Sequence, residues 1–281
     1  MGGITNVITR MHAVKWSTFK RISLSVGCAT MLPGVLLAEV SYLDLIDLLA
    51  QPEPKAVSIG VPSGFGAANG LMFASVAYTD QDPNTGIEDD VDGSISIGVG
   101  LGDPRTGIAT EIVIGVTSVS TSLWGDGTFG DEGNIGIKFH RQILGLPSAR
   151  IASMAFGVGN LAGWGGTRDL PRNIYAAYSQ ISDVNIGQNF FPVNTTFGLG
   201  SAVANVDRDA GVFASMGIGI TPDVSAGVSW LGDEVQVGAV YFPRFLSGVS
   251  TAFTYADVTH LNSDSGRMIL SLSYAFDWWS K

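Results

Sequence analysis

Cysteine is almost absent from this chain of 281 residues: Cys28 is the only one, so no disulfide can form within the chain. Charged residues are scarce as well, at 14% against the roughly 25% of an ordinary soluble domain. The sequence contains no HExxH, CxxC, phosphate-loop or paired-carboxylate motif. Catalysis therefore has little support, and we expect a protein that is not an enzyme and holds no cofactor.

Basic residues are also few, with 15 Lys and Arg against 25 Asp and Glu. Four of the basic residues (Arg10, Lys15, Lys20 and Arg21) and none of the acidic ones precede residue 39. The chain from residue 39 onward therefore carries 11 basic and 25 acidic side chains, a net charge of −14. Because nucleic-acid binding depends on Lys and Arg at the phosphates, no nucleic-acid partner is expected.

The first 38 residues have the pattern of an export signal. Lys15, Lys20 and Arg21 precede an apolar run over residues 22–37, and Ala38 ends a small-residue cleavage site. We predict a signal peptide over residues 1–38, with either Met1 or Met11 as the translation start. Pro33 and Gly34 interrupt the run, which is too short to remain as a membrane anchor. A lipoprotein cleavage box ending at Cys28 stays open as the alternative.

Period-two alternation of apolar with small or polar residues dominates the rest of the chain. Ile95, Ile97 and Val99 alternate with serine and glycine, for example, and no segment after residue 50 keeps a helical period. We predict an all-β protein, an antiparallel transmembrane β-barrel of about twelve strands. The expected strands are 71–78, 93–101, 108–119, 134–141, 150–158, 173–181, 194–201, 211–220, 224–231, 234–242, 248–256 and 267–276.

The last expected strand is the most informative, because its apolar face ends in aromatic residues. That face carries Met268, Leu270, Leu272, Tyr274, Phe276 and Trp278. The pattern resembles bacterial outer-membrane β-barrel proteins, whose C-terminal strand is the recognition signal for the barrel insertion machinery. The resemblance implies that Leu270, Leu272, Tyr274, Phe276 and Trp278 form such an insertion signal. Three residues (279–281) follow the aromatic at which family members usually stop.

The connectors between the expected strands alternate in length, as short periplasmic turns and long external loops do in these barrels. Two connectors break the rule: 182–193 is long where a short turn is expected, and 232–233 is tight where a long loop is expected. We divide the chain into the signal peptide (1–38), a periplasmic or plug segment (39–62) and the barrel (63–281). Within 39–62 we expect a short amphipathic helix over 40–50 and a strand-like run over 56–62. A helix packed on the rim, a plug in the lumen and a docking element for a periplasmic partner stay open.

If the apolar faces meet lipid, mostly Gly, Ser, Ala and Thr line the lumen. Four larger polar residues are expected there: Glu111, Lys138, His140 and Gln236. Glu111 and Lys138 lie on neighbouring strands and are expected to pair. A diffusive porin normally carries a charged constriction, and few charges are expected here.

The segment 80–93 concentrates acidic residues in one external loop. Asp80, Asp82 and Asn84 match the first ligand positions of a calcium loop, but Thr85 stands where the sharp turn needs glycine. We expect loosely bound divalent cations, Ca²⁺ or Mg²⁺, as the alternative to a designed metal site.

Three functions from different classes follow. The first is a non-catalytic outer-membrane barrel in cell-envelope or surface-polysaccharide biology, because the strands between 134 and 179 are similar to YjbH-like exopolysaccharide-associated barrels. The second is a porin-like channel for small solutes, and the third is a secreted β-sandwich binding module. An outer-membrane lipid hydrolase is the enzymatic alternative, with His260 and Ser263 in one loop. Expected partners are outer-membrane lipid, lipopolysaccharide and the insertion machinery, with a polysaccharide or a periplasmic protein as open alternatives.

Overall fold

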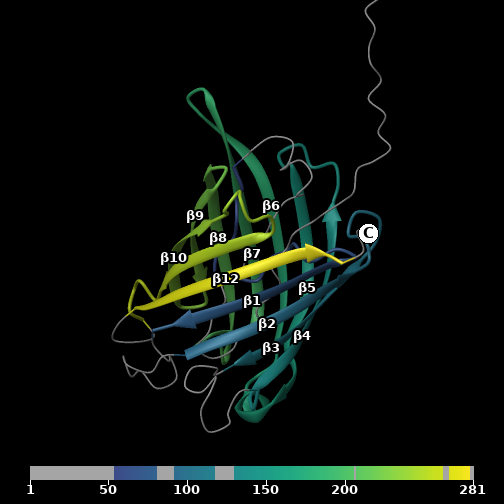
Figure 1. Cartoon of the computed structure of the whole chain (residues 1–281), viewed down its shortest axis with the longest axis vertical. Coiled ribbons are helices and arrows are strands. Elements are labelled where there is room, and N and C mark those ends of the chain that lie inside the picture. The colour runs from purple at the N-terminus through teal and green to yellow at the C-terminus, as the bar shows by residue number, and fades with distance from the viewer. Residues whose placement is uncertain (1–53, 81–91, 118–129, 206, 262–265, 279–281) are drawn as a thin grey trace, which may run out of the picture.

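A computed structural model describes residues 54–80, 92–117, 130–205, 207–261 and 266–278. They form a closed antiparallel barrel in which each strand pairs with its sequence neighbours and the last strand pairs with the first (Figure 1). The prediction of a twelve-stranded barrel is confirmed. The strands are β1 (Leu71–Thr79), β2 (Asp92–Leu101), β3 (Ala109–Thr117), β4 (Gly133–Ile143), β5 (Ile151–Trp164), β6 (Asn173–Ile186), β7 (Asn189–Ala204), β8 (Asp209–Thr221), β9 (Val224–Leu231), β10 (Glu234–Tyr241), β11 (Val249–Ala256) and β12 (Arg267–Asp277).

The expected signal peptide and the expected helix over 40–50 lie outside the described residues, and the division of the chain at residues 38 and 62 stays a prediction. No helix within the described ranges is long and apolar enough to cross a membrane.

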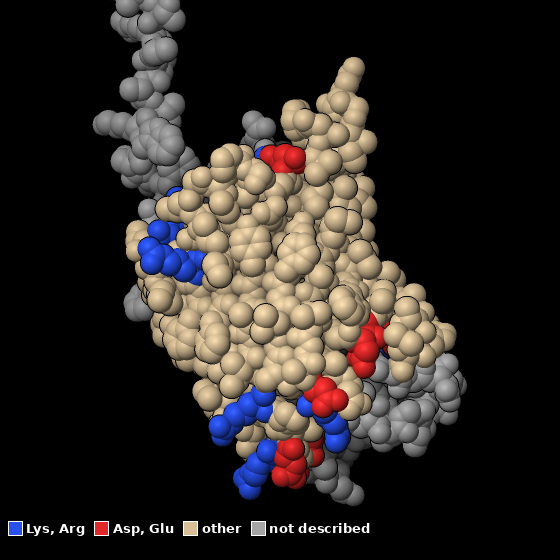
Figure 2. All heavy atoms as spheres, turned by 180° about the vertical axis from the view of Figure 1, so that it is seen from behind, with Lys and Arg blue, Asp and Glu red and all other residues tan. Residues whose placement is uncertain are grey.

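A single closed barrel contradicts the β-sandwich alternative, because a sandwich has two sheets that hide their apolar faces in a common core. Here one face of each strand, rich in large apolar residues, points away from the barrel axis and is exposed. Leu270 and Leu272 of β12 are 50% and 49% exposed, whereas Ser271 and Ser273 between them are 2% exposed. The face of the barrel seen in Figure 2 has a broad central area without Lys, Arg, Asp or Glu, and the charged side chains on this face lie mainly towards its margins.

The two ends of the barrel differ in their connectors. Short connectors at 102–108, 144–150, 187–188, 222–223 and 242–248 lie at one end, where β1 begins and β12 ends. We call this the short-turn end and the opposite one the long-loop end. At the long-loop end β5 continues to Trp164, and a 3₁₀ helix, η1 (Gly165–Asp169), occupies part of the expected loop.

The prediction of a long connector over residues 182–193 is wrong. β6 and β7 extend into it and pair down to Ile186 and Asn189, so that only Gly187 and Gln188 form the turn. Gly187 has a φ of 65°, which suits a two-residue hairpin turn. The resulting hairpin projects beyond the rim at the top of Figure 1.

Three aromatic side chains point inward, contrary to the expected lining of small residues. Phe73, Tyr175 and Phe213 are buried and lie against glycines of neighbouring strands, Gly98, Gly157 and Gly198 respectively. A Cβ at any of these glycines would collide with the facing ring. Each large ring therefore needs a glycine beside it, an alternation of large and small residues that fills narrow barrels.

Residues 55–69, which we call the inserted segment, lie inside the barrel rather than in its wall. Residues 56–67 are all buried. The segment starts at the short-turn end, where Lys55 meets Ser225, and returns there, where the Asn69 N–H donates to the Gly102 carbonyl. Between these points Val61 packs among inward residues nearer the long-loop end, such as Tyr175, Phe213 and Leu231. The segment therefore makes a U-turn within the lumen.

Candidate functional site: the barrel lumen

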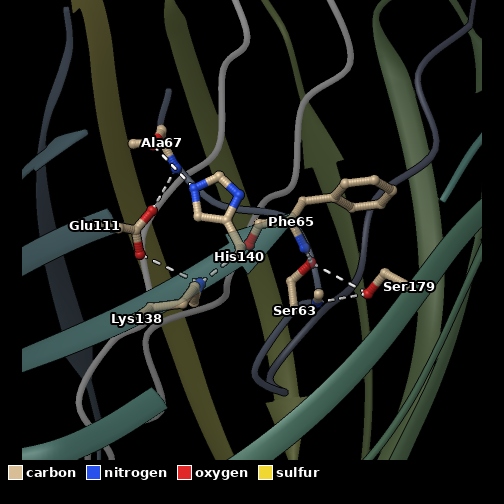
Figure 3. Close-up of polar contacts among 8 residues, drawn as sticks. Ser63, Phe65, Ala67, Glu111, Lys138, His140 and Ser179 are labelled. Atoms are coloured by element: carbon tan, nitrogen blue, oxygen red, sulfur yellow. Dashed lines mark hydrogen bonds and ion pairs between the residues drawn. The ribbon is translucent and has the colours of Figure 1, made fainter. Parts of the chain in front are cut away.

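Glu111 and Lys138 form a buried ion pair on the inner wall. Glu111 of β3 is directly opposite Lys138 of β4, and Lys138 Nζ lies 3.2 Å from Glu111 Oε1. Both side chains are at most 1% exposed. The pair also holds the inserted segment: the Ala67 N–H donates to Glu111 Oε2 over 2.7 Å, and Lys138 Nζ donates to the Phe65 carbonyl over 3.2 Å (Figure 3). Both charges thus have partners in the wall and in the segment.

His140 contributes a third contact from β4. Its Nε2 lies 3.0 Å from the Ala67 carbonyl oxygen, and its ring lies against Gly66, where a Cβ would collide with it. Figure 3 shows Glu111, Lys138 and His140 gathered around Phe65 and Ala67. This cluster is a clamp on the returning arm of the segment.

Hydroxyl groups hold the rest of the segment. The Gly64 N–H donates to Ser179 Oγ over 2.8 Å, and the Ser63 and Ser179 hydroxyls lie 3.3 Å apart. On the entering arm, Ser58 Oγ lies 2.7 Å from Thr196 Oγ1, which in turn lies 2.6 Å from Ser179 Oγ. The segment is thus bound by hydrogen bonds of the kind that a hydroxylated molecule would make.

Gln236 lies at the bend of the segment. Its amide contacts Gly60, where a Cβ would overlap Gln236 Oε1, and its Nε2 donates to Glu234 Oε1. Glu234 also pairs with Arg267, whose Nη2 lies 2.8 Å from Glu234 Oε2. Glu234 and Arg267 are both nearly buried near the long-loop end, so a second ion pair lies beyond the segment.

Lys55 marks the short-turn end of the segment. Its Nζ lies 4.3 Å from the centre of the Phe242 ring, and its carbonyl accepts a hydrogen bond from Ser225. Desolvation lowers the pKa of the Lys55 ammonium to about 8, although the charge of Asp223 acts in the opposite direction. Asp223 is itself held by Arg244, whose Nη2 donates to Asp223 Oδ2 over 2.7 Å; this hydrogen bond lowers the Asp223 pKa and raises that of Arg244.

Each buried basic side chain of the described barrel has an acidic partner, and a further acid, Asp257, is completely buried. The buried lysine and arginine side chains are Lys138 and Arg267, each bound to a glutamate. Lys and Arg are the usual means by which a pore attracts anions. Apart from Arg267 Nε, the buried side-chain atoms of the described residues that have no hydrogen-bond partner belong to hydroxyl and amide groups.

The structure places the sequence-predicted residues as follows. Glu111, Lys138, His140 and Gln236 all lie inside, and three of them form the clamp. The five residues of the expected insertion signal all point outward. Asp80 Oδ1 accepts a hydrogen bond of 2.7 Å from the Met268 N–H, whereas Asp82 and Asn84 lie outside the described residues. Within the described ranges no three metal-ligating side chains come together.

Sequence reasoning missed Glu234, Arg267, Ser179 and Thr196 as lumen residues with contacts of their own. Strand alternation places all four on inner faces, so the pattern contained that signal. Their partners were hidden because the path of the inserted segment depends on contacts between residues more than a hundred positions apart, such as Ser58 and Thr196.

No family model matches the chain. Curated proteins yield no match either. Among solved structures, the KdgM porin is 8% identical, with a TM-score of 0.47 over 73% of this chain and 99% of that chain. The outer-membrane protein Omp33 of Acinetobacter baumannii is 11% identical, with a TM-score of 0.40 over 74% and 98%. An outer-membrane channel from Pseudomonas putida F1 is also 11% identical, with a TM-score of 0.45 over 75% and 97%.

These distant likenesses transfer no solute and no residue role to this chain. They do not show the expected likeness to YjbH-like barrels either.

Proposed function

We propose that this protein is a non-enzymatic, porin-like channel of a bacterial outer membrane, that it passes small uncharged polar solutes, and that the inserted segment closes it. The observation that carries the proposal is a polar lumen with paired charges inside a barrel whose outer surface is apolar. We assign the short-turn end to the periplasm, because barrels of this class have short turns there.

The outer surface supports the membrane location. Large apolar side chains such as Ile97, Phe156 and Phe197 are about half exposed, an arrangement that is costly in water and favourable in lipid. The outward residues of β12 end in Tyr274, Phe276 and Trp278, which suits contact with the membrane interface. The proposed partners are therefore outer-membrane lipid with lipopolysaccharide, and the barrel insertion machinery.

The paired charges support uncharged solutes. An anion that reached Lys138 would compete with Glu111 in direct contact, and one that reached Arg267 would compete with Glu234. Removing a buried charge from its partner is strongly unfavourable. Hydroxyl and amide groups make no such demand, since they exchange one neutral hydrogen bond for another.

The way in which the segment is held supports its role as the closing element. It contacts the wall through hydrogen bonds and packing that involve Ser58, Ser63, Gly64 and the backbone of residues 65–67. Both of its arms leave through the short-turn end, so it can withdraw without opening any strand pair. The sequence also suggested a role in surface-polysaccharide biology. Every contact of the described residues that this role explains is explained equally well by a channel.

A disulfide lock tests the proposal. Because Ser58 Oγ and Thr196 Oγ1 lie 2.7 Å apart, the variant S58C/T196C with Cys28→Ser is suited to form a reversible crosslink between segment and wall. We expect steps of conductance in planar bilayers for the reduced protein, and their loss on oxidation. The single variants S58C and T196C, treated in the same way, are the controls.

A folded, heat-modifiable barrel that never conducts in the reduced state would contradict the channel function. Conductance that is equal in the oxidised and reduced states would contradict the role of the segment.

A further inference from the structure

The polar residues of the inner wall follow the strand register and form two continuous rows. The first polar row crosses six neighbouring strands, β5 to β10, at directly paired positions: Ser153, Ser179, Thr196, Ser215, Ser229 and Gln236. The second polar row crosses the other six strands, β11, β12 and β1 to β4: Ser250, Ser273, Ser75, Ser96, Gly115 and Asn134, with glycine as its one step without a side chain.

Each row runs from one mouth of the barrel to the other. Ser153 lies near the short-turn end of β5, and Gln236 lies near the long-loop end of β10. In the same way, Ser250 lies at the short-turn end of β11 and Asn134 at the long-loop end of β4. The two rows divide the circumference of the barrel between them, so they rise along opposite halves of its wall.

The inserted segment binds to the first polar row. Ser58 bonds to Thr196, Ser63 and Gly64 bond to Ser179, and Gly60 contacts Gln236. Gly64 also lies against the Ser153 carbonyl, where a Cβ would collide. Four of the six positions in this row therefore touch the segment.

Both rows contain hydrogen-bonding groups that have no partner within the described structure. In the first, Ser215 Oγ, Ser229 Oγ and Gln236 Oε1 have no partner within the described structure. In the second, the same is true of Ser250 Oγ and of both amide atoms of Asn134, whose side chain is completely buried and faces inward. Inward residues outside the rows, namely Ser94, Thr117, Asn194 and Thr254, also have unpaired polar atoms. Buried polar groups are normally satisfied, so this set of unpaired groups on the inner wall indicates that the lumen serves a hydrogen-bonding guest.

The spacing of the rows indicates which guest. Neighbouring strands lie about 4.8 Å apart, so each row offers a neutral hydrogen-bonding side chain about every 4.8 Å, except at Gly115 of the second row. This is close to the length of one sugar ring, and a linear saccharide presents hydroxyl groups at that repeat. Ser and Asn side chains both donate and accept, as sugar hydroxyls require.

From these observations we infer that the two polar rows are binding tracks for uncharged, polyhydroxylated solutes of the linear saccharide type, and that the inserted segment occupies the first track in place of such a solute. The inference rests on the proposed channel function, because it names the solute of that same lumen. Solute and segment compete for Ser179 and Thr196, so solute binding favours withdrawal of the segment.

Binding to the folded, full-length barrel in detergent tests the inference without relying on conductance. The probe is raffinose, an uncharged trisaccharide, measured by titration calorimetry, with trigalacturonate as an anionic probe of the same number of rings. We expect raffinose to bind more tightly than trigalacturonate. Oxidising S58C/T196C should abolish raffinose binding, because the segment then stays in the lumen and the residues of both rows stay buried.

Variants of the second track give a matched comparison. S96A/S250A removes two hydroxyls from that row, and S94A/T117V removes two other inward, buried groups that lie outside both rows. We expect S96A/S250A to weaken raffinose binding at that row about tenfold in the reduced protein, since a hydrogen bond contributes about 0.5–1.5 kcal/mol. S94A/T117V should leave the affinity unchanged.

No raffinose binding in either redox state, tighter binding of trigalacturonate, or equal losses in the two double variants would overturn the inference. Conductance without raffinose binding would mean that the inference about the solute is wrong and the channel function stands. Raffinose binding without conductance would mean that the channel function is wrong although the lumen binds saccharides.

Discussion

Glu111 divides its two carboxylate oxygens between the wall and the inserted segment. Oε1 pairs with Lys138 and Oε2 accepts the Ala67 N–H, so Glu111→Gln leaves Lys138 without a buried counter-charge. Breaking a buried pair from one side costs about 3–5 kcal/mol. We expect E111Q to lower the free energy of unfolding by about that amount, measured by urea titration of the refolded barrel in detergent. The loss of unfolding free energy in E111Q/K138M should be smaller than the sum of the losses in E111Q and in K138M.

Arg150 and Asp183 provide the control pair, since Arg150 Nε lies 2.8 Å from Asp183 Oδ2 but both side chains are partly exposed. Exposed pairs contribute about 0–1 kcal/mol. An E111Q loss no larger than that of R150Q would contradict the assignment of Glu111 as a clamp residue.

Lys55 makes the anchoring of the segment depend on pH. Its pKa is lowered from 10.5 to about 8 in the folded protein, so the folded state binds this proton less tightly than the unfolded chain does. The cost of burying the charged amine is fully present below pH 8 and disappears as the pH rises to about 10.5. Compared with Lys55→Met, the wild type should therefore gain stability across that window, measured as the difference between their urea midpoints. A difference that stays constant from pH 7 to 10.5 would contradict burial of Lys55.

At the scale of the elements, the β6–β7 hairpin extends beyond what the barrel needs. Ile186 and Phe190 near its tip are 56% and 68% exposed. We expect that removing residues 185–190 and joining Val184 to Phe191 through Asn-Gly keeps the gel shift on heating and the conductance, because the deleted residues form the tip of the projecting hairpin (Figure 1). Asn-Gly favours a two-residue hairpin turn. Loss of the compact, unheated band would show that the hairpin is needed for the fold.

The same hairpin shows where sequence reasoning stops. Val184 and Ile186 continue the alternation of β6, and Gly187 marks a turn, so part of the signal was present. Pro192 argued against a strand, since proline cannot donate to a sheet ladder. In β7 it pairs opposite Asp183, close to the tip. The alternation on both sides of Pro192 is therefore the better guide to the length of these two strands.

At the scale of the whole molecule, an exposed outer face and a buried inner face divide the residues of every strand. Ile114 lies near the middle of β3 and points outward, whereas Ile108 lies in the adjoining connector at the short-turn end. Ile114→Arg should cost about 2–4 kcal/mol of folding free energy in lipid vesicles, and Ile108→Arg about 0–1 kcal/mol, because the penalty depends on depth in the bilayer. Equal effects would contradict the proposed position of the membrane.

The strand number and the two faces could be predicted because alternation is a local property of the sequence: Ser94, Ser96 and Gly98 face inward as expected. What fills the lumen is not a local property. Phe73 and Tyr175 continue their strands' inner faces, and only their glycine neighbours on adjacent strands leave room for the rings. The inserted segment lies in place through contacts with many strands, so its course follows from the closed barrel and not from residues 55–69 alone.

The U-turn of the inserted segment has a consequence for the order of assembly. Both of its arms pass the same mouth, so the chain is not threaded through the ring that the pairing of β1 with β12 closes. The wall can therefore form first, and the segment can enter afterwards as a separate step. If the segment fails to enter or is withdrawn, the barrel wall stays complete and the segment can enter it later.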